Sequence, residues 1–283
     1  MYIRQCCGNA GIAMADYEQK KERLLTRMEE LSCQDLTVAF SGGVDSSLLL
    51  RLACGYAAGS KRRIYAVTAQ SELMPEQDLA IAERVAGEAG ALHHILRLRE
   101  LQEAGVRENS RDRCYLCKHY LFRRILEFSA EKGVKTVLEG TNEDDLHVYR
   151  PGIRAVRELG VLSPLAEAGL TKQEVRRMAA EYGISVAARP SAPCLATRFP
   201  YGTALSLPEL KRVEKGEAYL RSLGFRNVRL RVYGCLVRIE VDAEDLEGLL
   251  DRRLEAAGFL KELGYQYVTL DLEGFRSGSM DMD

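Results

Sequence analysis

The residues of this chain that are best suited to chemistry lie in four short segments of its 283 residues. Two of the segments are polar and contain glycine: Ser-Gly-Gly-Val-Asp-Ser at 41–46 and Gly-Thr-Asn-Glu-Asp-Asp at 140–145. The other two carry thiols, as the Cys-x-x-Cys pair Cys114 and Cys117 and as Cys194 in a proline-rich stretch. Glycine amides and hydroxyls suit phosphate binding and carboxylates suit Mg²⁺, whereas thiols suit metal, redox or sulfur chemistry.

The 41–46 segment is predicted to bind phosphate. It follows a short apolar run, 36–40, and precedes a helical pattern, so its amides lie at a helix N-terminus, where an anion is favoured. Asp45 is acidic, which favours a metal-binding or helix-capping role. The GxxxxGK[ST] pattern of the common P-loop NTPases is absent, so cleavage at the γ-phosphate is not expected. The candidate ligands of the phosphate are Ser41, Gly42, Gly43, Val44, Asp45 and Ser46.

The 140–145 segment is predicted to be a turn that holds a metal ion. It follows a second apolar run, and Thr141 and Asn142 are residues that favour turns. Asp144 and Asp145 offer two carboxylates that can share Mg²⁺ with phosphate oxygens. The alternative interpretation is a solvated acidic loop.

The thiols offer several kinds of site. The spacing of Cys114 and Cys117 lets two thiolates bind one metal or cluster, or form a redox pair. Cys194 lies in a rigid, polar segment that suits a reactive group better than core packing. Three thiols are one ligand short of a structural zinc site, and the four histidines offer no strongly zinc-like fourth ligand, so cluster, zinc and free thiols stay open from spacing alone. The cysteines interpreted as buried hydrophobes are Cys33, Cys54 and Cys235.

Alternating strand and helix patterns are predicted to position the first segments. The expected strands are the apolar runs at 36–40, 64–69, 93–98 and 136–140. The expected helices span 17–32, 44–58, 76–88 and 115–131. This alternation predicts an α/β fold with a doubly wound parallel sheet, whose ligand site lies at the carboxyl ends of the strands.

The pattern changes at three prolines between 189 and 201, where a second unit is expected to begin. A helix at 207–224, an antiparallel strand pair at 228–234 and 236–242, a helix at 244–264 and a strand at 267–272 predict a smaller α+β domain. The expected divisions are an N-terminal extension at 1–16, a main domain at 17–199 and a C-terminal domain at 200–283. Met14 is an alternative start of the protein.

Composition narrows the class of protein. Hydrophobic residues make up 46% of the chain and charged residues 29%, which is ordinary for a globular protein. The formal net charge of −1 disfavours a nucleic-acid partner. There is no apolar run long enough for a membrane span or a signal peptide, so a cytoplasmic protein is expected, and its eight cysteines are expected to be thiols rather than disulfides.

The SGGVDS run is the motif of the PP-loop ATP pyrophosphatases, and the chain resembles that group. The resemblance implies an adenine nucleotide α-hydrolase-like fold and cleavage of ATP to AMP and pyrophosphate. The loop would hold the departing pyrophosphate while a substrate oxygen attacks the α-phosphorus. It also implies that Ala66 and Thr68, near the end of the second strand, contact adenine, and that Thr141 and Asn142 lie near the nucleotide.

Longer segments resemble the LarE family, the ATP-dependent sacrificial sulfur transferases of nickel-pincer nucleotide synthesis. They are AFSGGVDSSLL, VTAQSELMPEQDLAIAERVA, NSRDRCYLCK, EGTNEDD, RPSAPCLATRFPYG and YVTLDLEGFRSGSM, within about residues 20 to 280. The resemblance implies that the substrate is pyridinium-3,5-biscarboxylic acid mononucleotide, which is adenylylated on a carboxylate and converted to a thiocarboxylate. It implies ATP and Mg²⁺ as cofactors and a homo-oligomer acting on a small nucleotide.

The same resemblance gives roles to single residues. Cys194 matches the cysteine that donates its sulfur and ends as dehydroalanine, whereas the added Cys114 and Cys117 resemble a three-cysteine subtype with a [4Fe-4S] cluster. Whether Cys194 is sacrificed or ligates iron stays open, with ligation favoured. The candidate substrate-phosphate residues are Arg198, Arg229 and Arg231, and the candidate Mg²⁺ ligands are Asp144, Asp145, Glu214 and Glu217.

Two other classes of protein fit parts of the pattern. One is a different PP-loop enzyme, such as a tRNA thiolase or an amide-forming synthetase, although the chain has no recognisable RNA-binding extension or glutaminase segment. The other is a metal or iron-sulfur regulator that retains a nucleotide-binding fold. Release of pyrophosphate separates the enzymes from the regulator.

Overall fold

The computed structural model describes residues 6–148, 151–190, 193–276 and 280, with side chains from residue 14 onward. The chain divides into two compact units. The first consists of Met1–Ser71, Glu76–Leu98 and Cys114–Ala192, and the second of Glu72–Pro75, Arg99–Arg113 and Pro193–Asp283. The second unit therefore takes two short segments from within the first two hundred residues, which the sequence patterns did not indicate.

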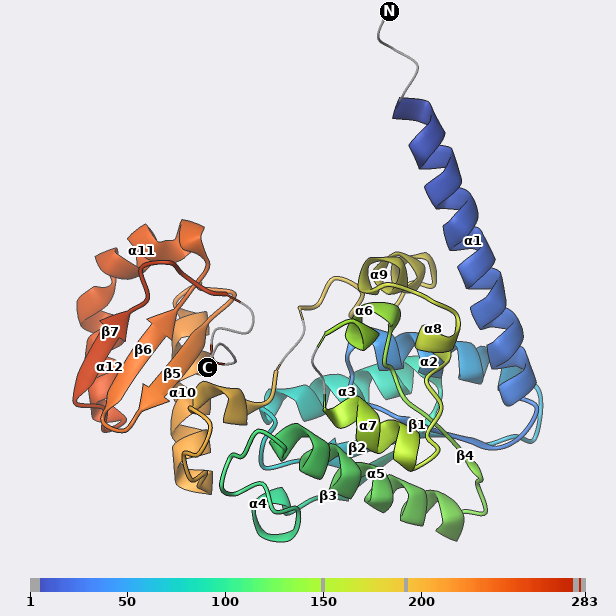
Figure 1. Ribbon diagram of the computed structural model, residues 1–283, viewed down its shortest axis with the longest axis horizontal. Coiled ribbons are helices and arrows are strands. Elements are labelled where there is room, and N and C mark those ends of the chain that lie inside the picture. The colour runs from blue at the N-terminus through green and yellow to red at the C-terminus, as the bar shows by residue number, and fades with distance from the viewer. Residues whose placement is uncertain (1–5, 149–150, 191–192, 277–279, 281–283) are drawn as a thin grey trace, which may run out of the picture. The chain divides into compact units, whose positions relative to one another are not determined.

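The first unit alternates strands and helices around a four-stranded parallel sheet of order β3-β2-β1-β4 (Figure 1). Its strands are β1 (Leu36–Ala39), β2 (Ile64–Gln70), β3 (Leu92–Arg97) and β4 (Thr136–Leu138). Its helices are α1 (Cys6–Leu31), α2 (Val44–Ala57), α3 (Gln77–Ala89), α5 (Arg113–Glu131), α6 (Glu143–Leu146), α7 (Gly152–Glu158), α8 (Pro164–Glu167) and α9 (Lys172–Glu181). The predicted α/β fold with a parallel sheet is confirmed.

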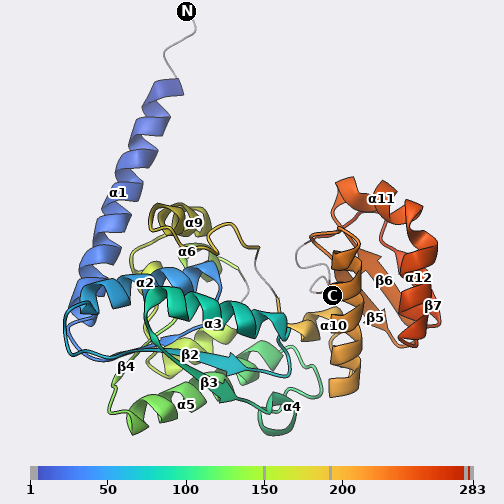
Figure 2. The same cartoon turned by 180° about the vertical axis from the view of Figure 1, so that it is seen from behind.

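Each face of this sheet has its own hydrophobic core, because successive side chains of a strand point to opposite faces. Leu36 and Val38 of β1 pack in a core with residues of α1, α2, α3 and α9. Tyr65 and Val67 of β2 pack in a second core with residues of α5 and α7. Figure 2 shows the helices above and below the sheet from behind. Covering both faces is what makes the sheet doubly wound, and it leaves the strand ends as the place for a ligand.

Helix α1 begins earlier than the expected residue 17. It starts at Cys6, and in both views its N-terminal half extends beyond the rest of the first unit (Figures 1 and 2). Residues 1–5 of the expected N-terminal extension lie outside the described residues.

The second unit contains a three-stranded sheet of order β5-β6-β7. Its strands are β5 (Arg229–Tyr233), β6 (Leu236–Glu240) and β7 (Tyr267–Leu270). Its helices are α4 (Glu100–Glu103), η1 (Leu195–Arg198), α10 (Leu207–Ser222), η2 (Ala243–Asp245), α11 (Leu246–Asp251) and α12 (Arg253–Glu262). The predicted antiparallel pair is β5 with β6, while β7 joins β6 in parallel.

The single helix expected over 244–264 is in fact η2, α11 and α12. Helices α11 and α12 are separated by Arg252, whose backbone, at φ −98° and ψ 14°, leaves helical geometry. Local apolar spacing does not reveal such a break, because the residues on either side keep a helical pattern.

Candidate active site

The 41–46 loop joins the end of β1 to the start of α2, as predicted, and its first glycine is sterically required. Gly42 has φ +68°, and a Cβ at this position would lie 3.0 Å from the backbone nitrogen of Ala82 in α3. Ser46 Oγ accepts from the amide of Ser41 at 3.3 Å and donates to the carbonyl of Gly43 at 3.2 Å. The loop is thus held in one shape at the N-terminus of a 14-residue helix, where an anion is favoured.

The 140–145 segment lies directly against this loop. A Cβ at Gly140 would be 2.9 Å from Cβ of Asp45 and 3.0 Å from the amide nitrogen of Ser46, so only glycine permits the approach. Asn142 Nδ2 donates to Asp45 Oδ1 at 3.3 Å. The structure therefore brings together two motifs that lie nearly a hundred residues apart, because β1 and β4 are neighbours in the parallel sheet.

A lysine that the motifs did not reveal completes this group. Lys172, the first residue of α9, forms an ion pair with Asp45 Oδ2, and its amide donates to Asp144 Oδ2 at 2.8 Å. The sequence near Lys172 contains a capping box, formed by Thr171 and Glu174. A capping box predicts where a helix begins, but it does not predict which residue Lys172 contacts. A positive charge thus lies beside the phosphate loop.

The two candidate Mg²⁺ ligands of the 140–145 turn take part in capping. Asp145 forms a capping box with Asn142, and Asp144 accepts from the amide of Lys172. Glu139, just before the turn, is buried and accepts from the amide and the hydroxyl of Thr141, each at 2.9 Å. These contacts hold the turn in place, and Mg²⁺ binding by its carboxylates stays a prediction.

The two candidate adenine contacts have different surroundings. Ala66 of β2 is fully buried, in the same hydrophobic core as Leu36 and Val38. Thr68 lies nearer the strand end, with its Oγ1 at 2.8 Å from Nε2 of His93 on β3. Burial lowers the pKa of His93, so its ring is neutral at neutral pH. The adenine role of Ala66 and Thr68 stays a prediction.

The three candidate cluster thiols belong to different units. Cys114 is exposed and Cys117 is half-buried; they lie three residues apart in α5, so both thiols are on one side of that helix. Cys194 is half-buried and immediately precedes η1 in the second unit. Among the described residues, no group of three or more His, Cys, Asp or Glu side chains is placed to hold a metal ion.

The candidate phosphate arginines lie in the second unit, and each is buried. Arg198 forms a two-point ion pair with Glu217, with Nε–Oε1 at 2.8 Å and Nη2–Oε2 at 3.0 Å. Arg231 Nε donates to Glu240 at 2.9 Å. Both oxygens of Glu217 thus already accept from a guanidinium, and a role for Glu217 in binding Mg²⁺ would require this pair to open. Glu214, the other candidate ligand on α10, is half-buried.

Arg229 differs from the other two arginines. It is 8% exposed, its Nη1 donates to the carbonyl of Val228 at 2.7 Å, and its Nε has no hydrogen-bond partner among the described residues. Burial, together with the nearby charges of Arg198 and Arg231, lowers the pKa of Arg229 to about 10. A buried cation with an unused donor suits an anionic ligand.

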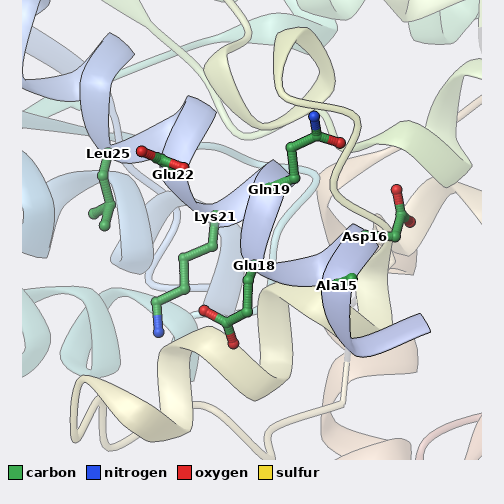
Figure 3. A pocket seen from close by; sticks show the side chains of 7 residues that line it. All are labelled: Ala15, Asp16, Glu18, Gln19, Lys21, Glu22 and Leu25. Carbon is green, nitrogen blue, oxygen red and sulfur yellow. The ribbon is translucent and has the colours of Figure 1, made fainter. Parts of the chain in front are cut away.

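A pocket of about 810 Å³ lies elsewhere in the first unit (Figure 3). Its lining residues all belong to α1: Ala15, Asp16, Glu18, Gln19, Lys21, Glu22 and Leu25. Lys21 among them is paired with Glu181 of α9. No residue of the phosphate loop or of the 140–145 turn lines this pocket, so it is not the candidate active site.

Comparison with known proteins matches both units. The family model of asparagine synthase matches residues 27–142, which include the phosphate loop and the first three residues of the 140–145 turn. The pyridinium-3,5-bisthiocarboxylic acid mononucleotide synthase of Lactiplantibacillus plantarum is 37% identical over 268 residues, covering 95% of this chain and 96% of the relative. This chain belongs to the LarE family. LarE-family likeness thus extends beyond residue 142 to the region of Cys194 and the arginines.

Two further relatives match this chain to different extents. An uncharacterized protein of Synechocystis is 36% identical over 266 residues, covering 93% of this chain and 97% of its own length. A tRNA-specific 2-thiouridylase of Rickettsia bellii is 27% identical over only 190 residues, 55% of this chain and 51% of that enzyme. Within the part of the LarE-family chain that the structure describes, no helix is both long and apolar enough to cross a membrane.

Proposed function

We propose that this chain adenylylates a carboxylate of pyridinium-3,5-biscarboxylic acid mononucleotide with ATP, releases pyrophosphate, and converts the carboxylate to a thiocarboxylate in nickel-pincer nucleotide biosynthesis. The observation that carries the proposal is the phosphate loop, against which Gly140 packs and whose Asp45 forms an ion pair with Lys172. This loop lies in a chain that matches a bisthiocarboxylic acid mononucleotide synthase over nearly its full length.

In the first step, a carboxylate oxygen of the substrate attacks the α-phosphorus of ATP and pyrophosphate leaves. The amides and hydroxyls of residues 41–46 bind the departing pyrophosphate at the start of α2, and the charge of Lys172 lies beside them. Asp45 and Asp144 are the carboxylates that would hold Mg²⁺ there, because Mg²⁺ prefers oxygen ligands. Bound Mg²⁺ neutralises charge on phosphate oxygens.

The second step has two alternative routes for the sulfur. In the first route, the thiolate of Cys194 attacks the adenylylated carbonyl carbon and AMP leaves, which gives a thioester. Loss of the Cα proton of residue 194 and cleavage of its Cβ–S bond then release the thiocarboxylate and leave dehydroalanine. Arg229 binds the substrate phosphate through its unused donor, and Arg231 lies two residues away on the same strand.

The experiment that tests this function measures both halves of the reaction with purified protein. With ATP, Mg²⁺ and the biscarboxylic acid mononucleotide, pyrophosphate release and a product heavier by the exchange of one oxygen for sulfur are expected. Asp45→Ala is expected to abolish both, whereas Cys194→Ala is expected to retain pyrophosphate release and lose sulfur transfer. Full sulfur transfer by Cys194→Ala would overturn the role of Cys194, and activity only with tRNA or ammonia would overturn the substrate.

The alternative route for the sulfur, which we favour, retains Cys194: we propose that Cys114, Cys117 and Cys194 are the ligands of a [4Fe-4S] cluster and that Cys194 does not end as dehydroalanine. The position of Cys114 and Cys117 on one side of α5 fits two ligands of one cluster. Three thiolates would leave one iron of such a cluster open, and that iron would supply a binding site for the sulfide to be delivered. Anaerobic purification is expected to give about four irons per chain, lost in Cys114→Ala; iron-free wild-type protein would contradict the cluster and leave Cys194 as the sulfur donor.

We also propose that the protein acts in the cytoplasm as a homo-oligomer on a small nucleotide rather than on nucleic acid. The formal net charge of −1 supports a partner other than a polyanion. Light scattering and a tRNA-binding assay test these two points, and a monomer or a tight tRNA complex would contradict them.

A further inference from the structure

We propose that Arg198 is a positioning residue, held by Glu217, that fixes the backbone of Cys194 relative to strand β5. The inference rests on the proposed role of Cys194 in sulfur delivery. It gives Arg198 a task different from the phosphate contact that its sequence context suggested. Cys194, Arg198, Glu217 and strand β5 all belong to the second unit.

Arg198 contacts the cysteine turn, which we define as residues 193–197. Its Nη1 donates to the carbonyls of Pro193 and Cys194, at 2.9 and 3.0 Å, and lies 3.0 Å from the hydroxyl of Thr197. Nε and Nη2 go to Glu217, and the side chain is 2% exposed. A guanidinium enclosed in this way is committed to protein groups and offers little surface to a substrate phosphate.

Glu217 connects Arg198 to the strand. Its side chain is 1% exposed, and Oε1 also accepts from the amide of Leu230 in β5 at 3.1 Å. Burial by itself would raise the pKa of Glu217, but the charges of Arg198 and Arg229 and the hydrogen bonds from Arg198 and Leu230 outweigh it and keep the pKa below its ordinary value. Glu217 is therefore ionised at neutral pH and bridges Arg198 and β5.

Two further features tie the cysteine turn to β5. Gly216, next to Glu217, lets α10 approach the strand, because a Cβ there would lie 2.5 Å from Cδ1 of Leu230. Arg231 Nη1 donates to the carbonyl of Thr197 at 2.8 Å. The turn is thus joined to β5 twice, once through Arg198 and Glu217 and once through Arg231.

This connection has a direct use in the proposed reaction. Strand β5 carries Arg229, the candidate contact for the substrate phosphate, so the phosphate site and the sulfur atom share one rigid frame. A nucleophile held in attacking geometry gains a large rate advantage, and a misplacement of about 1 Å costs on the order of 10²-fold in rate. Loss of Arg198 would leave the thiol present but poorly placed.

The experiment compares Arg198→Lys and Glu217→Gln with a matched control, Arg221→Gln. Arg221 also contacts Glu217, at 3.4 Å, and in the part of the chain that the structure describes it makes no hydrogen bond to the cysteine turn. Three rates are measured. Two are the rates of pyrophosphate release and of single-turnover sulfur transfer. The third, measured without substrate, is the rate at which iodoacetamide alkylates Cys194, and peptide mass mapping monitors this reaction. Circular dichroism establishes that each variant is folded.

In Arg198→Lys, sulfur transfer is expected to fall by roughly 10²-fold while pyrophosphate release and the KM for the pyridinium nucleotide stay within about threefold of wild type. Alkylation of Cys194 is expected to rise several-fold as its turn loosens. Glu217→Gln should shift both rates in the same directions but less, and Arg221→Gln should shift neither. A raised KM with an unchanged transfer rate would overturn the proposal in favour of a phosphate contact.

Equal losses in Arg198→Lys and Arg221→Gln would also overturn the proposal, since they would indicate general destabilisation. If Arg198→Lys does not fold, Glu217→Gln alone decides by the same measurements. The alkylation rate needs no turnover, so it tests the positioning role even if the proposed substrate is wrong.

Discussion

At the scale of single residues, the candidate active site depends on Asp45 having several neighbours at once. Its carboxylate contacts both Asn142 and Lys172, while Gly140 packs against its Cβ. The loop motif supplies the acid, but the groups that hold it come from two other parts of the chain.

Lys172 is expected to contribute to pyrophosphate departure because its charge lies beside the phosphate loop. Lys172→Met should lower the rate of pyrophosphate release by about 10²-fold, the usual effect of losing one group that stabilises developing negative charge. Its ion pair with Asp45 is partly exposed, at 31% and 19%, so stability should fall by only about 1 kcal/mol. Steady-state kinetics and urea unfolding measure the two effects.

The control for Lys172→Met is Lys20→Met. Lys20 also pairs with a residue of α9, Glu174, and its ion pairs within the described residues go to Glu174 and Asp16 rather than to the phosphate loop. Equal kinetic losses in the two variants would contradict a specific role of Lys172.

Gly140 is expected to tolerate no side chain. In Gly140→Ala, the new methyl group would overlap Asp45 and the amide of Ser46, so the loop must shift, and a loss of stability of about 1–3 kcal/mol is expected together with weaker ATP binding. Gly87→Ala, in α3, has nothing within 4 Å and should stabilise by about 0.5–1 kcal/mol. Thermal unfolding measures the stability of both variants, and calorimetric titration measures their affinity for ATP. If Gly140→Ala behaved like Gly87→Ala in both measurements, the close approach of Gly140 to Asp45 and Ser46 would be refuted.

At the scale of elements, α10 and β5 are joined by a buried charge as well as by apolar packing. Glu217 of α10 accepts from Arg198 and from the amide of Leu230 in β5. Breaking such a buried pair by removing one partner typically costs about 3–5 kcal/mol, because it leaves the other charge uncompensated.

The lowered pKa of Glu217 predicts a loss of stability in acid. Between the folded pKa and the ordinary value of 4.5, the unfolded chain binds a proton that the folded chain does not, so stability increases with pH across this window and is lost as pH falls through it. Urea unfolding from pH 3 to pH 6.5 should show this slope in wild type and a shallower one in Glu217→Gln. Identical slopes would contradict a lowered pKa.

At the scale of the whole molecule, the second unit is not continuous in sequence. It includes residues 72–75 and 99–113 as well as the C-terminal part of the chain. Asn109, buried and with φ +48°, donates from Nδ2 to the carbonyls of Phe199 and Pro200 at 3.2 and 2.8 Å. Asparagine tolerates this backbone better than most residues.

A fragment of residues 200–283 is therefore expected to lack part of its own unit. It should unfold less cooperatively, and at a lower temperature, than the same residues in the full chain, as measured by circular dichroism and amide hydrogen exchange. In the full chain, Asn109→Ala should cost about 1–3 kcal/mol, since it leaves buried carbonyls unpaired. A fragment with full protection from exchange would contradict this division.

Much of the fold could be predicted because its signals are local. The strand at 36–40, the helix after the phosphate loop and the antiparallel pair at 228–242 follow from apolar periodicity and turn residues within a few positions of one another. The contact between the 41–46 and 140–145 segments could not be predicted in the same way, because it depends on the strand order that places β1 beside β4. The family resemblance implied only that Thr141 and Asn142 lie near the nucleotide.

The sequence alone therefore determined the doubly wound fold, the phosphate loop and the family to which the chain belongs. Tertiary structure decided which partner each charged group takes: Lys172 meets Asp45 across 127 residues, and Arg198 meets Glu217 rather than solvent. The physical reason is that a charged side chain has no preferred partner along the sequence. Its partner is chosen by burial and by the approach of elements that the chain brings together only on folding.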